Sequence, residues 1–154
     1  MSRILAVCGL VLGLSCCGGQ REQRDAYASV EVRVFLAGFR QAVIRDDQEL
    51  LLDKYIDPCY RREQLEDLLG GDRRQFFDEL FGLGRRRFSD IAEMEFVGGD
   101  VHFARPEYGP RSDIEVAQCS VVLTYEDGGQ VEDCVYLIKY SNGERTFAVE
   151  GPRG

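Results

Sequence analysis

Hydrophobic residues in the first half of the chain recur with the period of an α-helix. The recurring positions follow the spacing i, i+3, i+4, i+7 and i+11, and they are Val32, Phe35, Leu36, Phe39 and Val43. Because 3.6 residues make one helical turn, these side chains share one side of a helix. The pattern predicts a long amphipathic helix that buries its apolar stripe.

Polar signals then predict a break and a second helix. Asp46 followed by Glu49 fits a capping box, in which each of the two side chains bonds the backbone N–H of the other residue. We expect a helix to follow through residues 50–56. Asp57-Pro58 ends it, because the residue before a proline avoids the α region.

Two shorter helices complete the first half. Residues 61–69 predict one that Gly70-Gly71 closes, since glycine accepts the left-handed conformation past a helix end. Asp72, with Gln75 three residues later, is another capping signal. The helix that it opens ends near Gly82, and its apolar residues are Phe76, Phe77, Leu80 and Phe81.

The pattern changes to the period of a β-strand after residue 90. Apolar and polar residues alternate over 92–96, and Val101 and Phe103 alternate with His102 after a turn at Gly98-Gly99. This alternation predicts two short strands. It also places His102 on the more polar face, where we interpret it as a surface residue.

The rest of the chain predicts an antiparallel meander. Residues 114–125 and 131–140 are long β-prone runs that a four-residue loop, 126–129, joins. Asn142-Gly143 predicts a two-residue hairpin turn, because both residues tolerate positive φ. Residues 146–150 form the last predicted strand.

A two-residue turn would also set the register of this final hairpin. It would place Ile138 opposite Phe147 and Tyr136 opposite Val149. Side chains that face each other on antiparallel strands share one face of the sheet. These four residues are therefore our candidates for a ligand pocket, and a purely structural place in the core is the alternative.

Helices followed by antiparallel strands predict an α+β fold, with the N-terminal helices packed on a curved antiparallel sheet. The length, 154 residues, suits one domain. A net charge of −8 argues against a nucleic-acid partner, which needs a basic surface. One His and no glycine-rich phosphate motif leave us expecting neither a metal nor another cofactor.

The first residues resemble a bacterial lipoprotein signal peptide. Arg3 precedes the uncharged run 4–14, which has the length of a signal-peptide core and is too short to span a bilayer. Leu12-Gly13-Leu14-Ser15-Cys16 matches the lipobox order of aliphatic residues, a small residue and a cysteine. The resemblance implies cleavage before Cys16 and acylation of its sulfur. Cys17 is the alternative acceptor, and an ordinary secretory signal is the alternative interpretation.

This interpretation divides the chain into a signal peptide (1–15), a lipidated cysteine with a flexible tether (16–28) and a single α+β domain (29–154). Several acyl chains would hold the protein stably on a membrane. The residue after Cys16 is not Asp, which favours the outer membrane if the source is Gram-negative. We expect a cell-envelope lipoprotein that faces the periplasm or the cell surface.

The order of elements resembles the cone-shaped nuclear-transport-factor-like fold, which includes ketosteroid-isomerase-like and SnoaL-like proteins. The resemblance rests on the long first helix (34–44), the Asp46-Asp47 break, the segment 50–58 and the final hairpin. The chain is also similar to uncharacterised envelope lipoproteins that carry Phe-Phe-Asp-Glu-Leu-Phe-Gly, here residues 76–82. The fold implies helices against a curled sheet that can hold a pocket, and the second resemblance implies no known activity.

Three cysteines remain after those of the signal peptide and the lipidation candidates are set aside: Cys59, Cys119 and Cys134. With a four-residue loop, Cys119 lies opposite Tyr136 and diagonal to Cys134. An exported compartment permits disulfides between cysteines at such a distance. A Cys119–Cys134 bridge, a bridge that involves Cys59, and free buried thiols all remain open.

Three functions fit these observations. The first is a non-enzymatic module that binds a small ligand or an envelope partner. The second is an isomerase-like or dehydratase-like enzyme, which needs a carboxyl of raised pKa beside a tyrosine; no such pair can be placed, so we assign no catalytic residue. The third is a structural assembly subunit. The basic run 85–87 either complements a helix C-terminus or contacts phosphate head groups.

Overall fold

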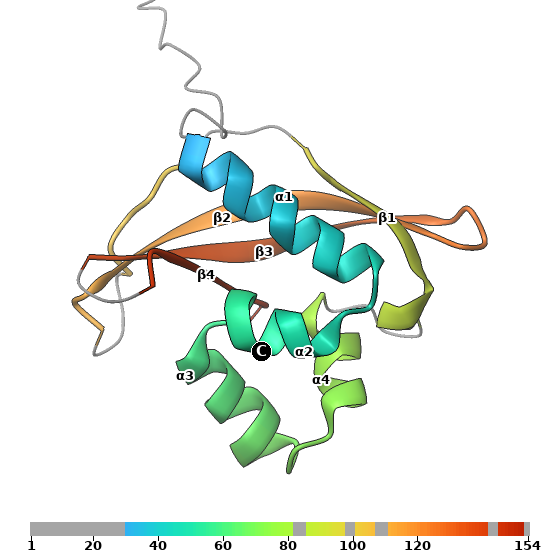
Figure 1. Cartoon of the computed structure of the whole chain (residues 1–154), viewed down its shortest axis with the longest axis horizontal. Helices are drawn as coiled ribbons and strands as arrows, with labels where there is room; N and C mark the ends of the chain where they lie inside the picture. Colours follow the sequence, from blue (N-terminus) through green and yellow to red (C-terminus); the bar gives the residue numbers. More distant parts are fainter. Residues whose placement is uncertain (1–29, 82–85, 98–100, 107–110, 142–144, 153–154) are drawn as a thin grey trace, which may run out of the picture.

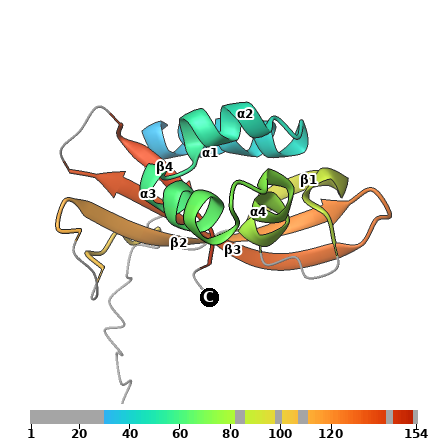
Figure 2. The ribbon, with the colours of Figure 1, turned by 90° about the horizontal axis from the view of Figure 1, so that it is seen from below.

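The computed structural model describes residues 30–81, 86–97, 101–106, 111–141, 145–152 and assigns them to an α+β fold. Helices come first, and a curled four-stranded antiparallel sheet follows them (Figure 1). The helices cover one face of this sheet (Figure 2). The predicted fold class is therefore confirmed at this level. Residues 1–28, the predicted signal peptide and tether, lie outside the described residues.

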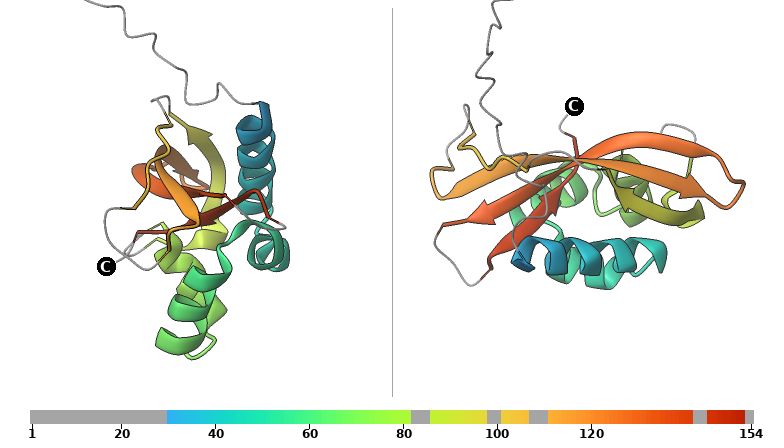
Figure 3. Two further views of the ribbon diagram at one scale, coloured as in Figure 1. Left: turned by 90° about the vertical axis from the view of Figure 1, so that its left-hand side faces the viewer. Right: turned by 90° about the horizontal axis from the view of Figure 1, so that it is seen from above.

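The predicted amphipathic helix is α1, Val30–Ile44, which crosses the sheet face along its length (Figures 1 and 3). Four residues of the apolar stripe are fully buried in the main core, and Phe35 is half-buried beside them. The helix ends where Asp46 takes a positive φ of 50°. Asn and Asp tolerate this left-handed conformation better than most residues, so the chain turns there.

The second helix begins one residue later than the sequence predicted. Asp47, not Asp46, caps α2 (Gln48–Leu50) by accepting the N–H of Leu50. Asp46 cannot cap because its left-handed backbone makes the turn. The helix continues as a π-type turn, η1 (Leu51–Tyr55), and the chain is extended at Ile56 and Asp57, as Pro58 requires.

The next helix starts earlier than predicted, at α3 (Pro58–Arg61), and continues as η2 (Arg62–Leu68). Gly70 and Gly71 then have positive φ, as expected of a glycine helix end. The helix α4 (Arg73–Leu80) follows, and the 3₁₀ turn η3 (Phe88–Asp90) leads into the sheet. Asp72 caps α4 through the N–H of Gln75, which confirms that capping signal.

The sheet has the order β1-β2-β3-β4, so each strand pairs with its neighbour in sequence. The strands are β1 (Ile91–Phe96), β2 (Ile114–Tyr125), β3 (Gln130–Tyr140) and β4 (Phe147–Glu150). A bulge between Ile91 and Glu93 lets Ile91 and Met94 both face the core. The predicted strand at 101–103 is wrong: only Ala104 pairs there, with Val116.

The β2–β3 register differs by one residue from the prediction. Thr124 pairs with Gln130, and the N–H of Tyr125 donates to the carbonyl of Gly129. The loop therefore has three residues, with Gly128 at a φ of 79°. A three-residue hairpin with one left-handed residue is a common alternative to the four-residue loop.

The β3–β4 register is also shifted by one residue, so the predicted pairs Ile138–Phe147 and Tyr136–Val149 are wrong. In the structure Lys139 faces Phe147 and Leu137 faces Val149. A one-residue slip moves a side chain to the other face of the sheet. The Asn142-Gly143 turn lies outside the described residues.

The two faces of the sheet have different roles. The helix-covered face forms the main core, which contains most of the large buried side chains. The outer face carries a small second cluster in which Ile114, Ile138 and Ala148 are buried. Exposed Gln118 and Ser120 share that outer face, so it is mixed in polarity.

Candidate functional site

An open groove of about 460 Å³ lies where the first turns of α1 pass the end of η1 and the start of β4. This volume falls within the range of small-molecule sites. The side chains that line the groove are Val30, Glu31, Val34, Phe35, Lys54, Tyr55, Thr146 and Phe147. Two exposed apolar side chains lie at its mouth, since Val30 and Val34 are 62% and 67% exposed, and the exposed Glu31 lies beside them.

Three aromatic rings form the inner part of the groove. The centroid of the Phe35 ring lies 5.3 Å from that of Tyr55 and 5.6 Å from that of Phe147. Gly38 lets Tyr55 pack closely on α1, since a Cβ at that position would overlap the Tyr55 hydroxyl. The rings are fixed by their neighbours, so the groove is preformed.

Arg145 holds the two sides of the groove together. Its guanidinium donates hydrogen bonds to the carbonyl of Asp53 at 2.7 Å and to the carbonyl of Ile56 at 2.9 Å. These carbonyls lie at the end of η1, and Arg145 precedes the groove residues Thr146 and Phe147. The contact therefore fixes the start of β4 beside the residues that follow η1.

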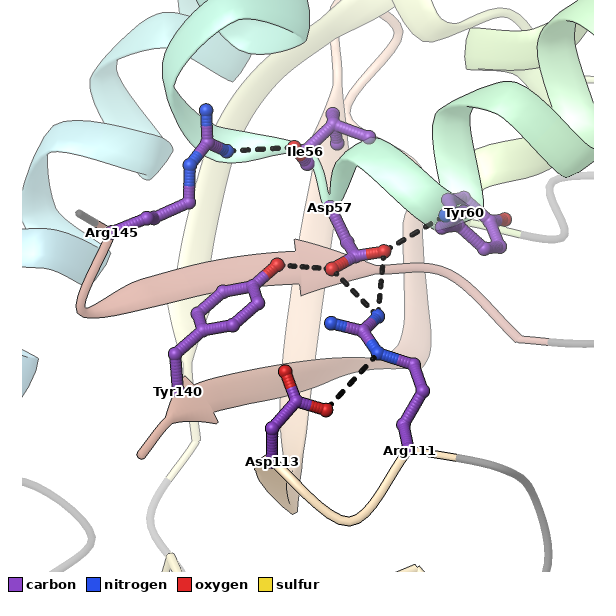
Figure 4. A network of polar contacts seen from close by, with 7 residues as sticks. All are labelled: Ile56, Asp57, Tyr60, Arg111, Asp113, Tyr140 and Arg145. Carbon is purple, nitrogen blue, oxygen red and sulfur yellow. Dashed lines mark hydrogen bonds and ion pairs between the residues drawn. The ribbon is translucent and has the colours of Figure 1, made fainter. Parts of the chain in front are cut away.

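A second site, polar in character, surrounds Asp57, whose side chain is fully buried. Its carboxylate accepts hydrogen bonds from the hydroxyl of Tyr140, from the guanidinium of Arg111 at 3.1 and 3.2 Å and from the backbone N–H of Tyr60 at 2.8 Å (Figure 4). Arg111 also lies 3.9 Å from the Asp113 carboxylate. We call Asp57, Arg111 and Tyr140 the Asp57 cluster.

The Asp57 cluster joins three parts of the chain. Asp57 caps α3, Arg111 lies in the segment before β2, and Tyr140 ends β3. The N–H of Asp57 also donates to the carbonyl of Val149, so β4 is fixed to the same point. The cluster therefore connects the helices to the sheet through one carboxylate.

Hydrogen bonds keep Asp57 ionised. Burial by itself raises the pKa of its carboxyl, but the bonds from Tyr140, Tyr60 and Arg111 together outweigh burial and hold that pKa below 3.8. Burial and the Asp57 carboxylate both raise the pKa of the Tyr140 hydroxyl. A carboxylate that is fully paired and always charged at neutral pH does not exchange protons readily, so the cluster is suited to holding the fold together rather than to acid–base catalysis.

The enzyme hypothesis expected a carboxyl of raised pKa beside a tyrosine, and Asp133 meets half of this condition. Burial raises the pKa of Asp133. Burial raises the pKa of Tyr125 to about 12; the Arg86 guanidinium opposes this rise, and the charges of Asp133 and Asp90 add to it. The buried Tyr125 hydroxyl, however, has no hydrogen-bond partner among the described residues, so the two groups are not joined as a proton-transfer pair.

Arg86, the middle residue of the basic run 85–87, already has partners within the protein. Arg86 forms hydrogen bonds of 3.0 and 3.1 Å with Asp127, and its guanidinium lies 4.4 Å from the centroid of the Tyr125 ring. Arg85 lies outside the described residues, and Arg87 is exposed. The arrangement of Arg86 favours a structural role over contact with lipid phosphate.

The four pocket candidates do not share one face. Phe147 lines the groove, whereas Val149 is fully buried in the main core. Ile138 is buried in the outer cluster, and Tyr136 is half-buried on the same outer face. The one-residue register shift explains the separation, and of the four candidates Phe147 alone lines the groove.

The three described cysteines are free thiols. Cys119 faces Val135 on the helix-covered side, and Cys134 faces Ser120 on the outer side. The Cys119–Cys134 bridge is therefore absent because the shifted register places the two thiols on opposite faces of the sheet. Burial raises the pKa of Cys119 to about 11, which leaves the thiol protonated and unreactive. Cys16 and Cys17 lie outside the described residues.

Sequence reasoning missed the groove cation Lys54 and the whole Asp57 cluster. The dipeptide Asp57-Pro58 does carry a signal, since Asp before Pro is typical of a helix start with Pro at its first position. Nothing in the sequence pairs Arg111 or Tyr140 with Asp57, because both lie more than 50 residues away.

Comparisons with protein families, with curated proteins and with solved structures found no match. Among the described residues, each helix is too short or too polar to cross a bilayer. The exposed position of His102 agrees with its interpretation as a surface residue. What the site can do therefore has to be inferred from its own geometry.

Proposed function

We propose that this chain is an exported, membrane-anchored lipoprotein whose domain binds a small ligand in the groove. The observation that carries this proposal is the preformed aromatic groove between α1, η1 and β4. The long helix across a curled sheet supports a cone-like domain of the nuclear-transport-factor-like kind. The lipobox-like segment that ends at Cys16 supports the anchor and a place in the cell envelope.

The groove chemistry favours a ligand with an apolar body and an anionic group. The half-buried Phe35 ring offers contact surface to the apolar part, and the largely buried Tyr55 and Phe147 form the floor beneath it. Lys54 is the cation among the lining residues, and its ammonium lies 5.3 Å from the centroid of the Tyr55 ring. A carboxylate or sulfonate bound at Lys54 would leave its hydrocarbon part over the three rings. Glu31, at the mouth, disfavours a second negative group.

A fluorescent polyene fatty acid, cis-parinaric acid, tests this proposal directly. We expect the full chain to bind the probe at one site, with enhanced fluorescence. Val34→Asp should weaken binding at least about tenfold, because it places a charge on the apolar mouth. Lys54→Glu should weaken binding of the anionic probe more than binding of the matching uncharged alcohol.

Leu68→Asp provides the matched control, since Leu68 is 69% exposed on η2 and does not line the groove. This variant should bind the probe as the wild type does. Equal binding by the Val34→Asp and Leu68→Asp variants would contradict a site in the groove.

The anchor is tested separately by intact mass of the membrane-extracted protein. A wild-type mass that begins at Cys16 with added acyl chains, and the loss of those chains in Cys16→Ser, is the expected result. A wild-type chain that carries its start methionine and no acyl group would contradict the anchor without affecting the groove.

A further inference from the structure

The outer face of α1 has a composition that differs from the rest of this acidic protein. Val30, Val34 and Ala37 are exposed in its centre, and Arg33 and Arg40 are exposed along one side. Within the described chain, neither arginine forms an ion pair or a side-chain hydrogen bond. Gln41 is exposed in the same centre, and Glu31 is exposed on the flank opposite the arginines. The centre and one flank of the face are thus mainly apolar and cationic in a chain of net charge −8.

Packing does not require these exposed residues. α1 already buries its opposite side, including Leu36 and Phe39, in the main core. The exposed valines are spaced i and i+4, so they form one continuous patch, and the arginines at i and i+7 lie in line beside them. An exposed apolar patch with a cationic border is typical of helices that lie on an anionic lipid surface.

We infer that the outer face of α1 docks on the surface of an anionic phospholipid bilayer. The position of the face supports this occupant, because α1 is the first described element after the proposed tether. Charge supports it too, because the exposed Arg33 and Arg40 complement anionic head groups. Only the tether depends on the proposed function.

Docking in this orientation would also place the groove beside the lipid. Val30 and Val34 belong both to the outer face and to the mouth of the groove. A ligand with an apolar body could therefore pass between the bilayer and the aromatic rings with little exposure to water. The membrane would act as the source or the destination of the ligand.

The chain contains no Trp, so a single introduced Trp reports on one position. We would reconstitute the full-length protein in phosphatidylcholine vesicles with and without phosphatidylglycerol, using lipids brominated along the acyl chain as quenchers. The reporter is Ala37→Trp on α1, and the control reporter is Gln118→Trp on the outer face of the sheet. Both positions are exposed.

We expect bromine to quench the A37W indole in anionic vesicles much more strongly than the Q118W indole. Adding Arg33→Glu and Arg40→Glu should remove most of this quenching, since each arginine near an anionic surface changes the affinity roughly fivefold. The matched pair Arg62→Glu and Arg74→Glu, exposed on η2 and α4, should leave the quenching unchanged. Circular dichroism would confirm that each variant is folded.

The outcomes separate docking from anchoring. If the protein floats with the vesicles but the two reporters are quenched equally, the docking inference is wrong and the anchor stands. If wild-type protein extracted from its host membrane does not float with vesicles, both are wrong. A blue shift of the A37W emission that depends on protein concentration, without vesicles, would show that a second copy covers the face and would overturn the inference.

Discussion

The groove and the Asp57 cluster are built from neighbouring residues yet differ in physical character. Lys54 and Tyr55 line the groove, and Asp57 forms the centre of the cluster two residues later. The groove is open, with exposed Val30 and Val34 at its mouth and aromatic rings at its floor. The cluster is polar, closed and fully hydrogen-bonded around its carboxylate.

This difference indicates which region serves the fold and which can serve a ligand. A buried charge is tolerated only when hydrogen-bond partners surround it. The Asp57 carboxylate bonds to partners within the protein, so it is not available to a ligand. Exposed valines beside rigid rings contribute little to folding and remain available for contacts with another molecule. Mutations in the cluster should therefore act on stability, and mutations in the groove on binding.

The largest expected effect is that of Asp57→Ala. The substitution leaves the Arg111 guanidinium beside a vacated buried position and removes the cap of α3. Losing one partner of a buried ion pair typically costs about 3–5 kcal/mol. Urea unfolding would measure it, with Asp53→Ala, at an exposed position, as the control. Equal stability of the two variants would show that the cluster does not hold the fold.

Tyr140→Phe should have a smaller effect, because it removes one hydrogen bond to Asp57 and leaves Arg111 in place. A hydrogen bond to a charged group contributes about 1.5–3 kcal/mol. Thermal unfolding would measure the loss, while cis-parinaric acid binding should be unchanged. Loss of probe binding by a folded Tyr140→Phe protein would show that the two regions are coupled.

Gly38→Ala should affect both stability and probe binding moderately, through the groove residue Tyr55. The added methyl would overlap the Tyr55 hydroxyl, so the ring must shift from its place in the groove. Overpacking of this kind typically costs about 1–3 kcal/mol. We expect lower stability together with weaker probe binding. Ala37→Gly, at the exposed neighbouring position, should change the stability by about 1 kcal/mol or less through helix propensity and should leave binding intact.

The smallest effect is the pH dependence that Asp57 contributes. The folded pKa of Asp57 lies below its ordinary value of 3.8, so the unfolded chain binds this proton more readily. The stabilisation is therefore complete above about pH 5 and is lost as the pH falls through 3.8 toward the folded pKa. The difference in unfolding free energy between wild type and Asp57→Asn should shrink between pH 5 and pH 3. A constant difference would contradict this linkage.

Local patterns were sufficient to predict most elements of the fold. The apolar stripe from Val32 to Val43 defines α1 because helical periodicity depends only on the order of residues. Gly70 and Asp72 likewise mark a helix end and a helix start through their own backbone chemistry. Phe147 was one of the predicted pocket residues and it lines the groove, although the strand register from which we selected it was wrong.

The sequence by itself determined most of the elements, their order and the buried side of α1, since each depends on the pattern of nearby residues. Only the tertiary structure decided the strand registers, and with them the opposite faces of Cys119 and Cys134. It also decided the meeting of Asp57 with Arg111 and Tyr140, which lie far apart in the chain. Such contacts depend on how loops close and layers pack, and a one-residue change in a loop reverses every side chain that follows.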